Sequence, residues 1–183
     1  MITVIYSNMG DDDCRILQRI WRDLPDVRVI EITPETEDYE DEVDAALAAE
    51  DDTLILCGHG TGLGLLYPNF DRGEYIVHEN NAGLIHAQRV ICDFCYASSF
   101  CERVGLHAFA TSMFISNVNE AYDNCLTALT QDQINANSER YADELNALLR
   151  ENVPLDEWVM RFGAHIDVEN EVDVFNRQGL CLI

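Results

Sequence analysis

Short apolar segments that alternate with helical patterns constrain the fold of this 183-residue chain more than any other feature of its sequence. Residues 2–6, 27–32 and 53–57 are apolar runs of strand length. Between them, apolar residues recur at helical spacing, first after the three aspartates at 11–13 and again within the acidic segment 35–52. This βαβαβ order predicts an α/β fold with a doubly wound, mostly parallel sheet and right-handed crossovers.

The rest of the chain extends this pattern. Residues 60–78 contain Gly-rich turns and are predicted to form a hairpin inserted after the third strand. The elements expected next are a short helix at 82–87, strands at 89–94 and 106–110 with a helical turn at 98–104 between them, helices at 120–129 and 131–150, and a helix opened by Pro154. Segments 172–175 and 180–183 are expected to form an edge strand. The sequence therefore predicts one domain over residues 1–183, with helices flanking the sheet and a mainly helical part at 118–165.

Charge and apolar content limit the classes of partner. The chain has 11 Lys and Arg against 34 Asp and Glu, which makes a net charge of −23, and 48% of its residues are hydrophobic. So much apolar material excludes a disordered chain. Phosphate binding requires clustered basic residues, so we expect no nucleic-acid partner and look instead to a protein or peptide. No pattern in the sequence sets the oligomeric state.

Seven cysteines are spread along the chain, at positions 14, 57, 92, 95, 101, 125 and 181. The number is odd, no signal-peptide pattern precedes the first strand, and no run of about eighteen apolar residues is present. We therefore expect a cytoplasmic protein with reduced thiols and no membrane partner. The thiols are then core residues, metal ligands or nucleophiles.

Two reactive side chains come directly after apolar strands. His59 follows strand 53–57 and Cys95 follows strand 89–94. Ligands of open α/β sheets bind where the carboxyl ends of the strands meet, so neighbouring strands would place these side chains together as a cysteine–histidine dyad. A helix that begins just after Cys95 is expected to lower the pKa of the thiol. The amide of Gly60 is free to point at a developing oxyanion.

The segments around these residues, LILCGHG (54–60) and VICDFCYASSF (90–100), resemble the motifs of the caspase-like cysteine peptidases of clan CD, most closely legumain, clostripain and gingipain. The resemblance implies a three-layer caspase-like fold over about residues 2–116, with Cys95 as nucleophile and His59 as proton-transfer residue. It also implies that the amides of Gly60 and Cys95 form the oxyanion hole. Asp93, two residues before the nucleophile, would bind a substrate Arg or Lys. Phe94 departs from the family, because many members have a small residue there.

Two other interpretations use the same residues or the same charge. Cys92 and Cys95 form a CxxC motif that, with Cys57 and His59, has the ligand types of a zinc site. Residues three apart on a strand face opposite sides of a sheet, so we expect no metal and no cofactor. The charge of −23 also fits a catalytically inactive caspase-like protein that acts by protein–protein interaction, including as a mimic of nucleic-acid charge on a basic partner.

Overall fold

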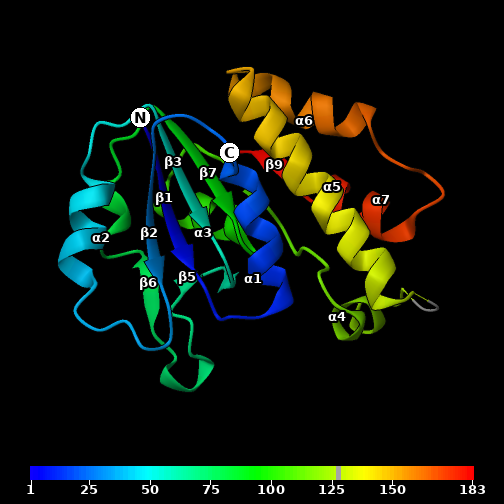
Figure 1. The fold of residues 1–183 in the computed structure, drawn as a ribbon, viewed down its shortest axis with the longest axis horizontal. Coiled ribbons are helices and arrows are strands. Elements are labelled where there is room, and N and C mark those ends of the chain that lie inside the picture. The colour runs from blue at the N-terminus through cyan, green and yellow to red at the C-terminus, as the bar shows by residue number, and fades with distance from the viewer. Residues whose placement is uncertain (127–128) are drawn as a thin grey trace.

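A mostly parallel six-stranded sheet forms the centre of the protein (Figure 1). The computed structural model describes residues 1–126 and 129–183. The strands lie in the order β2–β1–β3–β7–β8–β9, and their bounds are β1 (Ile2–Ser7), β2 (Val27–Ile32), β3 (Thr53–Cys57), β7 (Arg89–Asp93), β8 (Phe109–Thr111) and β9 (Leu180–Leu182). The first five strands run parallel, and β9 pairs antiparallel with β8 at the edge. The predicted α/β class and mostly parallel sheet are confirmed.

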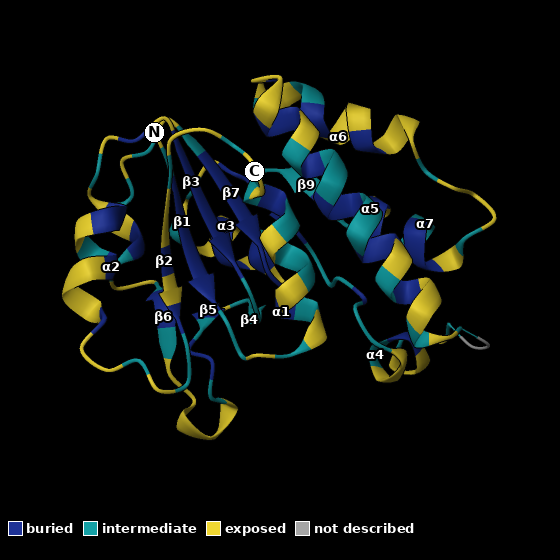
Figure 2. Ribbon diagram, in the orientation of Figure 1, coloured by how far each residue is buried: buried dark blue, intermediate teal, exposed yellow. Residues whose placement is uncertain are grey.

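Helices cover both faces of this sheet, so the central strands β1, β3 and β7 are buried almost throughout their length. In β1, Val4 and Tyr6 pack into one apolar cluster, and Ile5 between them packs into the other. The first face is covered by α1 (Asp12–Leu17), α5 (Gln131–Arg150) and α6 (Leu155–Ala164), and the second by α2 (Glu40–Leu47) and α3 (Ala97–Val104). Figure 2 shows the resulting buried strands between partly exposed helices. The other helical elements are η1 (Gln18–Trp21), η2 (Phe70–Arg72), η3 (Ala82–Leu84), α4 (Val118–Asp123) and α7 (Glu171–Gln178).

The insertion predicted at residues 60–78 is present as a separate small sheet. It consists of the antiparallel strands β4 (Gly60–Thr61), β5 (Gly64–Leu66) and β6 (Tyr75–His78). β4 begins three residues after β3 ends, and it contacts α3. The insertion therefore starts at the edge of the main sheet where His59 is located.

The long helix is confirmed at its predicted bounds. Thr130 caps α5 through the Gln133 amide, and the Gln133 side chain bonds back to the Thr130 backbone. α5 runs along the sheet face that also carries α1 (Figure 1). Among the described residues, no helix combines the length and apolar character needed to cross a membrane.

Several boundaries differ from the prediction. Segment 172–175 is not a strand but part of α7, because Asn170 caps a helix there whose buried residues recur at helical spacing. The helix expected at 120–129 ends at Asp123, ahead of a left-handed turn at Cys125, and residues 127–128 lie outside the described chain. The short helix expected at 82–87 is only the 3-10 turn η3. The strand expected at 106–110 begins later, as β8 at Phe109. Pro154 is the N-cap of α6, so the helix begins one residue after it.

Candidate active site

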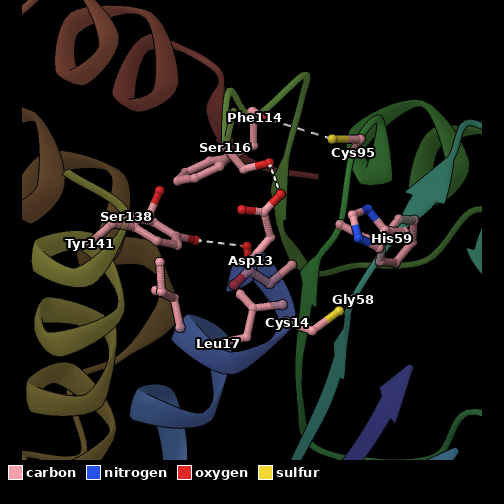
Figure 3. Close-up of a pocket in the computed structure, with 13 residues that line it drawn as sticks. Asp13, Cys14, Leu17, Gly58, His59, Cys95, Phe114, Ser116, Ser138 and Tyr141 are labelled. Atoms are coloured by element: carbon pink, nitrogen blue, oxygen red, sulfur yellow. Dashed lines mark hydrogen bonds between the residues drawn. The ribbon is translucent and has the colours of Figure 1, made fainter. Parts of the chain in front are cut away.

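The sheet brings the two predicted reactive residues to the same pocket. β3 and β7 are parallel neighbours, and Cys57 lies opposite Asp93 in their register. His59 and Cys95 each follow two residues later, and both line one narrow cavity of about 50 Å³ (Figure 3). Asp93 and Gly58 line it as well. The cavity lies on the face covered by α1 and α5, which contribute Cys14 and Tyr141 to its walls.

The imidazole of His59 is paired with Asp11. His59 Nε2 lies 2.7 Å from Asp11 Oδ2, while Asp11 Oδ1 accepts a hydrogen bond from the Cys14 amide at 2.8 Å and caps α1. Burial disfavours the charged ring, yet the hydrogen bonds to Asp11 and Cys14 outweigh it and raise the pKa of His59 to about 10. The same bond holds the pKa of Asp11 well below its usual range. The ring is therefore an oriented imidazolium at neutral pH.

The thiol of Cys95 is held as a neutral group. Its Sγ donates a hydrogen bond to the Phe114 carbonyl at 3.6 Å, and burial raises the pKa of Cys95 to about 11. We expected the start of α3 to lower this pKa, and the prediction is wrong in direction. The helix begins at Ala97, after Tyr96 in a left-handed conformation, and desolvation of the half-buried thiol outweighs any effect of the helix.

Gly60 and Cys95 are the residues whose amides were expected to hold an oxyanion. Within the described chain, neither amide donates a hydrogen bond to a strand. Leu66 N–H donates to the His59 carbonyl at 2.9 Å, so Gly60 and Leu65 form a non-hydrogen-bonded pair and the Gly60 amide points away from β5. Within the described chain, the Cys95 amide has no backbone partner. Gly60 and Cys95 are both partly exposed, and of the two only Cys95 lines the pocket.

Phe94 explains why Gly60 must be a glycine. A Cβ at position 60 would lie 2.2 Å from Cδ2 of the Phe94 ring, which is itself buried. The aromatic residue that departs from the family pattern therefore occupies the space that a side chain at position 60 would need. The two positions are complementary in size.

We expect Gly60→Ala to destabilise the fold. Overpacking against a buried ring typically costs about 1–3 kcal/mol of unfolding free energy. Gly83→Ala is the matched control, because a Cβ there meets no atom within 4 Å. Urea unfolding of both variants measures the difference. Equal midpoints for the two variants would show that Phe94 yields without cost.

Asp93 carries a buried carboxylate that is only half satisfied. Its Oδ1 accepts a hydrogen bond from the Tyr141 hydroxyl at 3.2 Å, and among the described residues its Oδ2 has no partner. Burial raises the pKa of Asp93 to about 7, and the bond from Tyr141 opposes this only in part. A polar atom left buried without a partner is costly, so Asp93 is an unfavourable group for the stability of the fold.

The zinc ligands considered from the sequence do not come together. Cys92 packs in the apolar cluster on the α2 and α3 face, whereas Cys57 packs in the cluster on the α1 and α5 face. Cys95 lies beyond the end of β7, in the pocket wall. Cys92 and Cys57 therefore lie on opposite faces of the sheet.

Asp11 and Tyr141 are the site residues that sequence analysis missed. In the sequence, the three aspartates at 11–13 only precede an apolar pattern of helical spacing. They also follow β1, however, which is the other neighbour of β3 and whose carboxyl end reaches the same edge of the sheet. That adjacency is a usable signal for Asp11. Tyr141 lies within a helix 48 residues after Asp93, and nothing in its local sequence marks it.

Comparison of the chain with protein-family models, with curated proteins and with solved structures gives no match. The class of the protein is therefore described from its fold and its pocket. It is an α/β protein with a thiol, an imidazole and a buried carboxylate in one pocket at the carboxyl ends of its strands.

Proposed function

We propose that the protein is a cysteine endopeptidase with a caspase-like fold. The observation that carries the proposal is that Cys95 and His59 line one pocket, whose wall also contains a carboxylate oxygen that has no partner among the described residues. The flanked, mostly parallel sheet and the insertion after β3 are compatible with that fold. The substrate is a protein or peptide, which needs no basic surface on the enzyme.

The residues suggest a definite course for peptide hydrolysis. The Cys95 thiol gives its proton to solvent, and its sulfur attacks the substrate carbonyl carbon, whose oxygen is held by the Gly60 and Cys95 amides. The His59 imidazolium then protonates the leaving amine as the C–N bond breaks. Neutral His59 accepts a proton from the water that attacks the acyl group, and the sulfur leaves and is reprotonated. Asp11 keeps the ring in place throughout.

Asp93 is the proposed determinant of specificity. Its Oδ2 has no partner among the described residues and is suited to the guanidinium or ammonium group of a substrate Arg or Lys, because such a cation would satisfy the buried carboxylate. The cavity of about 50 Å³ has room for only a few water molecules, so its walls must move apart to admit a long side chain. Cleavage is therefore expected after basic residues.

A panel of fluorogenic peptides with different residues before the cleaved bond tests this proposal. The wild type should prefer Arg or Lys, and Asp93→Asn should reduce kcat/KM for those substrates by about 10- to 100-fold, the value of one hydrogen bond between charged groups. Cleavage after alanine or methionine should change little in the variant and serves as the internal control. A basic preference that survives in Asp93→Asn would assign specificity to another residue.

A second candidate function is an inactive, acidic interaction protein with the same fold. The neutral Cys95 thiol favours it, since a pKa raised to about 11 leaves little thiolate at neutral pH. A peptide electrophile ending in Arg distinguishes the two candidates. Labelling confined to Cys95 supports the peptidase, whereas an unlabelled protein without turnover on the whole panel supports the binding protein.

A further inference from the structure

We propose that Asp11, Cys14 and His59 form a binding site for a thiophilic divalent cation of the zinc type. One ligand atom from each residue, the carboxylate oxygen, the thiol sulfur and a ring nitrogen, lies within 4.8 Å of the other two. None of the cysteines in the CxxC motif takes part. The site adjoins the pocket described above, because Cys14 and His59 both line it (Figure 3).

The fold holds these ligands in place before any ion arrives. Asp11 is the N-cap of α1 and Cys14 lies three residues later, so the hydrogen bond from the Cys14 amide to Asp11 Oδ1 orients one ligand against the other. Asp11 Oδ2 remains directed at His59, with 2.7 Å between Oδ2 and Nε2. His59 is brought in by the end of β3, the neighbour of β1. Cys14 is buried, which limits the freedom of its side chain.

The spacing of the ligand atoms is close to that of a tetrahedral site. Bond lengths of about 2.3 Å to sulfur and about 2.0–2.2 Å to nitrogen and oxygen place zinc ligands about 3.3–3.6 Å apart. The oxygen and nitrogen are 2.7 Å apart here, and no pair exceeds 4.8 Å. Shifts of about 1 Å or less therefore complete the geometry. A fourth ligand, such as water, would complete the tetrahedron.

The donor types select the ion. A sulfur with an imidazole nitrogen favours zinc over magnesium or calcium, which prefer oxygen ligands. Binding exchanges the thiol proton of Cys14 and the ring proton at Nε2 of His59 for the metal, so both protons go to solvent. The Met9 amide already lies 3.4 Å from the Cys14 sulfur and would donate to the thiolate.

An ion bound at this site would inhibit peptide hydrolysis, a consequence that rests on the proposed function. Metal at Nε2 replaces the hydrogen bond between His59 and Asp11 and leaves His59 without the proton that it must give to the leaving amine. The thiol of Cys95 stays free, since it is not a ligand. The ion would thus inhibit through the proton donor and not through the nucleophile.

Titration of the full-length protein with cobalt(II), and with zinc in competition with a chromophoric chelator, tests the site. We expect one ion per chain and a thiolate-to-cobalt charge-transfer band in the wild type and equally in Cys95→Ser. Cys14→Ser should lose the band and bind zinc at least about 100-fold more weakly. Asp11→Asn, which keeps the acceptor that caps α1, should weaken zinc binding while circular dichroism shows an intact fold.

Each result decides a separate part of the inference. Wild-type affinity in Cys14→Ser, or loss of the charge-transfer band in Cys95→Ser, would overturn the site. Zinc should abolish wild-type peptide cleavage at one equivalent, and undiminished turnover with the ion bound would overturn the inhibition. If no substrate is cleaved at all, the proposed function fails, yet the cobalt spectra still judge the site.

Discussion

Cys95→Ala is expected to reduce kcat/KM for peptide hydrolysis by at least about 10³-fold, because the variant has no sulfur to form the acyl-enzyme. His59→Ala should cause a loss of similar size, since the leaving amine then lacks its proton donor. The two residues act in one reaction sequence, so the double variant should be little worse than either single one. Initial rates with an Arg-terminated fluorogenic peptide measure all three.

The matched control for this experiment is Cys125→Ser. Cys125 is exposed, and it is not among the residues that line the pocket, so its replacement removes a thiol without touching the site. Cleavage should be unchanged. Undiminished turnover by Cys95→Ala would refute the proposed nucleophile and direct attention to the other pocket thiol, Cys14.

Asp93→Asn should stabilise the protein at pH 8 by up to about 4 kcal/mol, since a shift of each pKa unit corresponds to about 1.4 kcal/mol. Burial raises the pKa of Asp93 to about 7 in the folded protein, whereas an aspartate in an unfolded chain has an ordinary pKa of 3.8. The folded state therefore retains a proton that the unfolded state has lost, and stability falls as pH rises from about 4 to 7. Asparagine cannot ionise, so the variant lacks this loss.

Urea unfolding at a series of pH values measures the effect. The difference between Asp93→Asn and the wild type should grow from about pH 4 to pH 7 and remain constant above that. Asp123→Asn, which removes a carboxylate that lies exposed at the end of α4, is the control and should leave the pH profile unchanged. A constant difference across the whole range would show that folding does not raise the pKa of Asp93.

Asp93→Asn is expected to change both the stability of the protein and its selectivity for basic substrates. Within residues 1–126 and 129–183, Oδ2 of the buried Asp93 carboxylate has no partner, so the charged group weakens the fold at neutral and alkaline pH. A neutral amide there would be less costly to bury. If Asp93→Asn is both more stable and less selective for basic substrates, the residue is retained for recognition. Such a trade of stability for activity is common at functional sites.

Much of the architecture could be predicted because it depends on local patterns. Apolar runs of strand length predicted β1, β2 and β3, and Gly-rich turns predicted the insertion after β3. Helical spacing predicted α5 over residues 131–150. The assignment failed for α7, since a short apolar segment such as 172–175 is compatible with a strand or a helix until its neighbours decide. The end of α4 was also predicted wrongly, because it depends on the left-handed turn at Cys125.

For the candidate site, the sequence by itself determined which reactive groups leave the ends of the strands, because residue order and strand length place His59 and Cys95 there. Only the tertiary structure decided their chemical state. His59 and its partner Asp11 are 48 residues apart in the sequence, as are Asp93 and its partner Tyr141. Cys95 and its partner Phe114 are 19 residues apart. A pKa depends on burial and on the groups within hydrogen-bond reach, which are set by packing between distant segments. The imidazolium, the neutral thiol and the half-satisfied carboxylate are therefore properties of the fold.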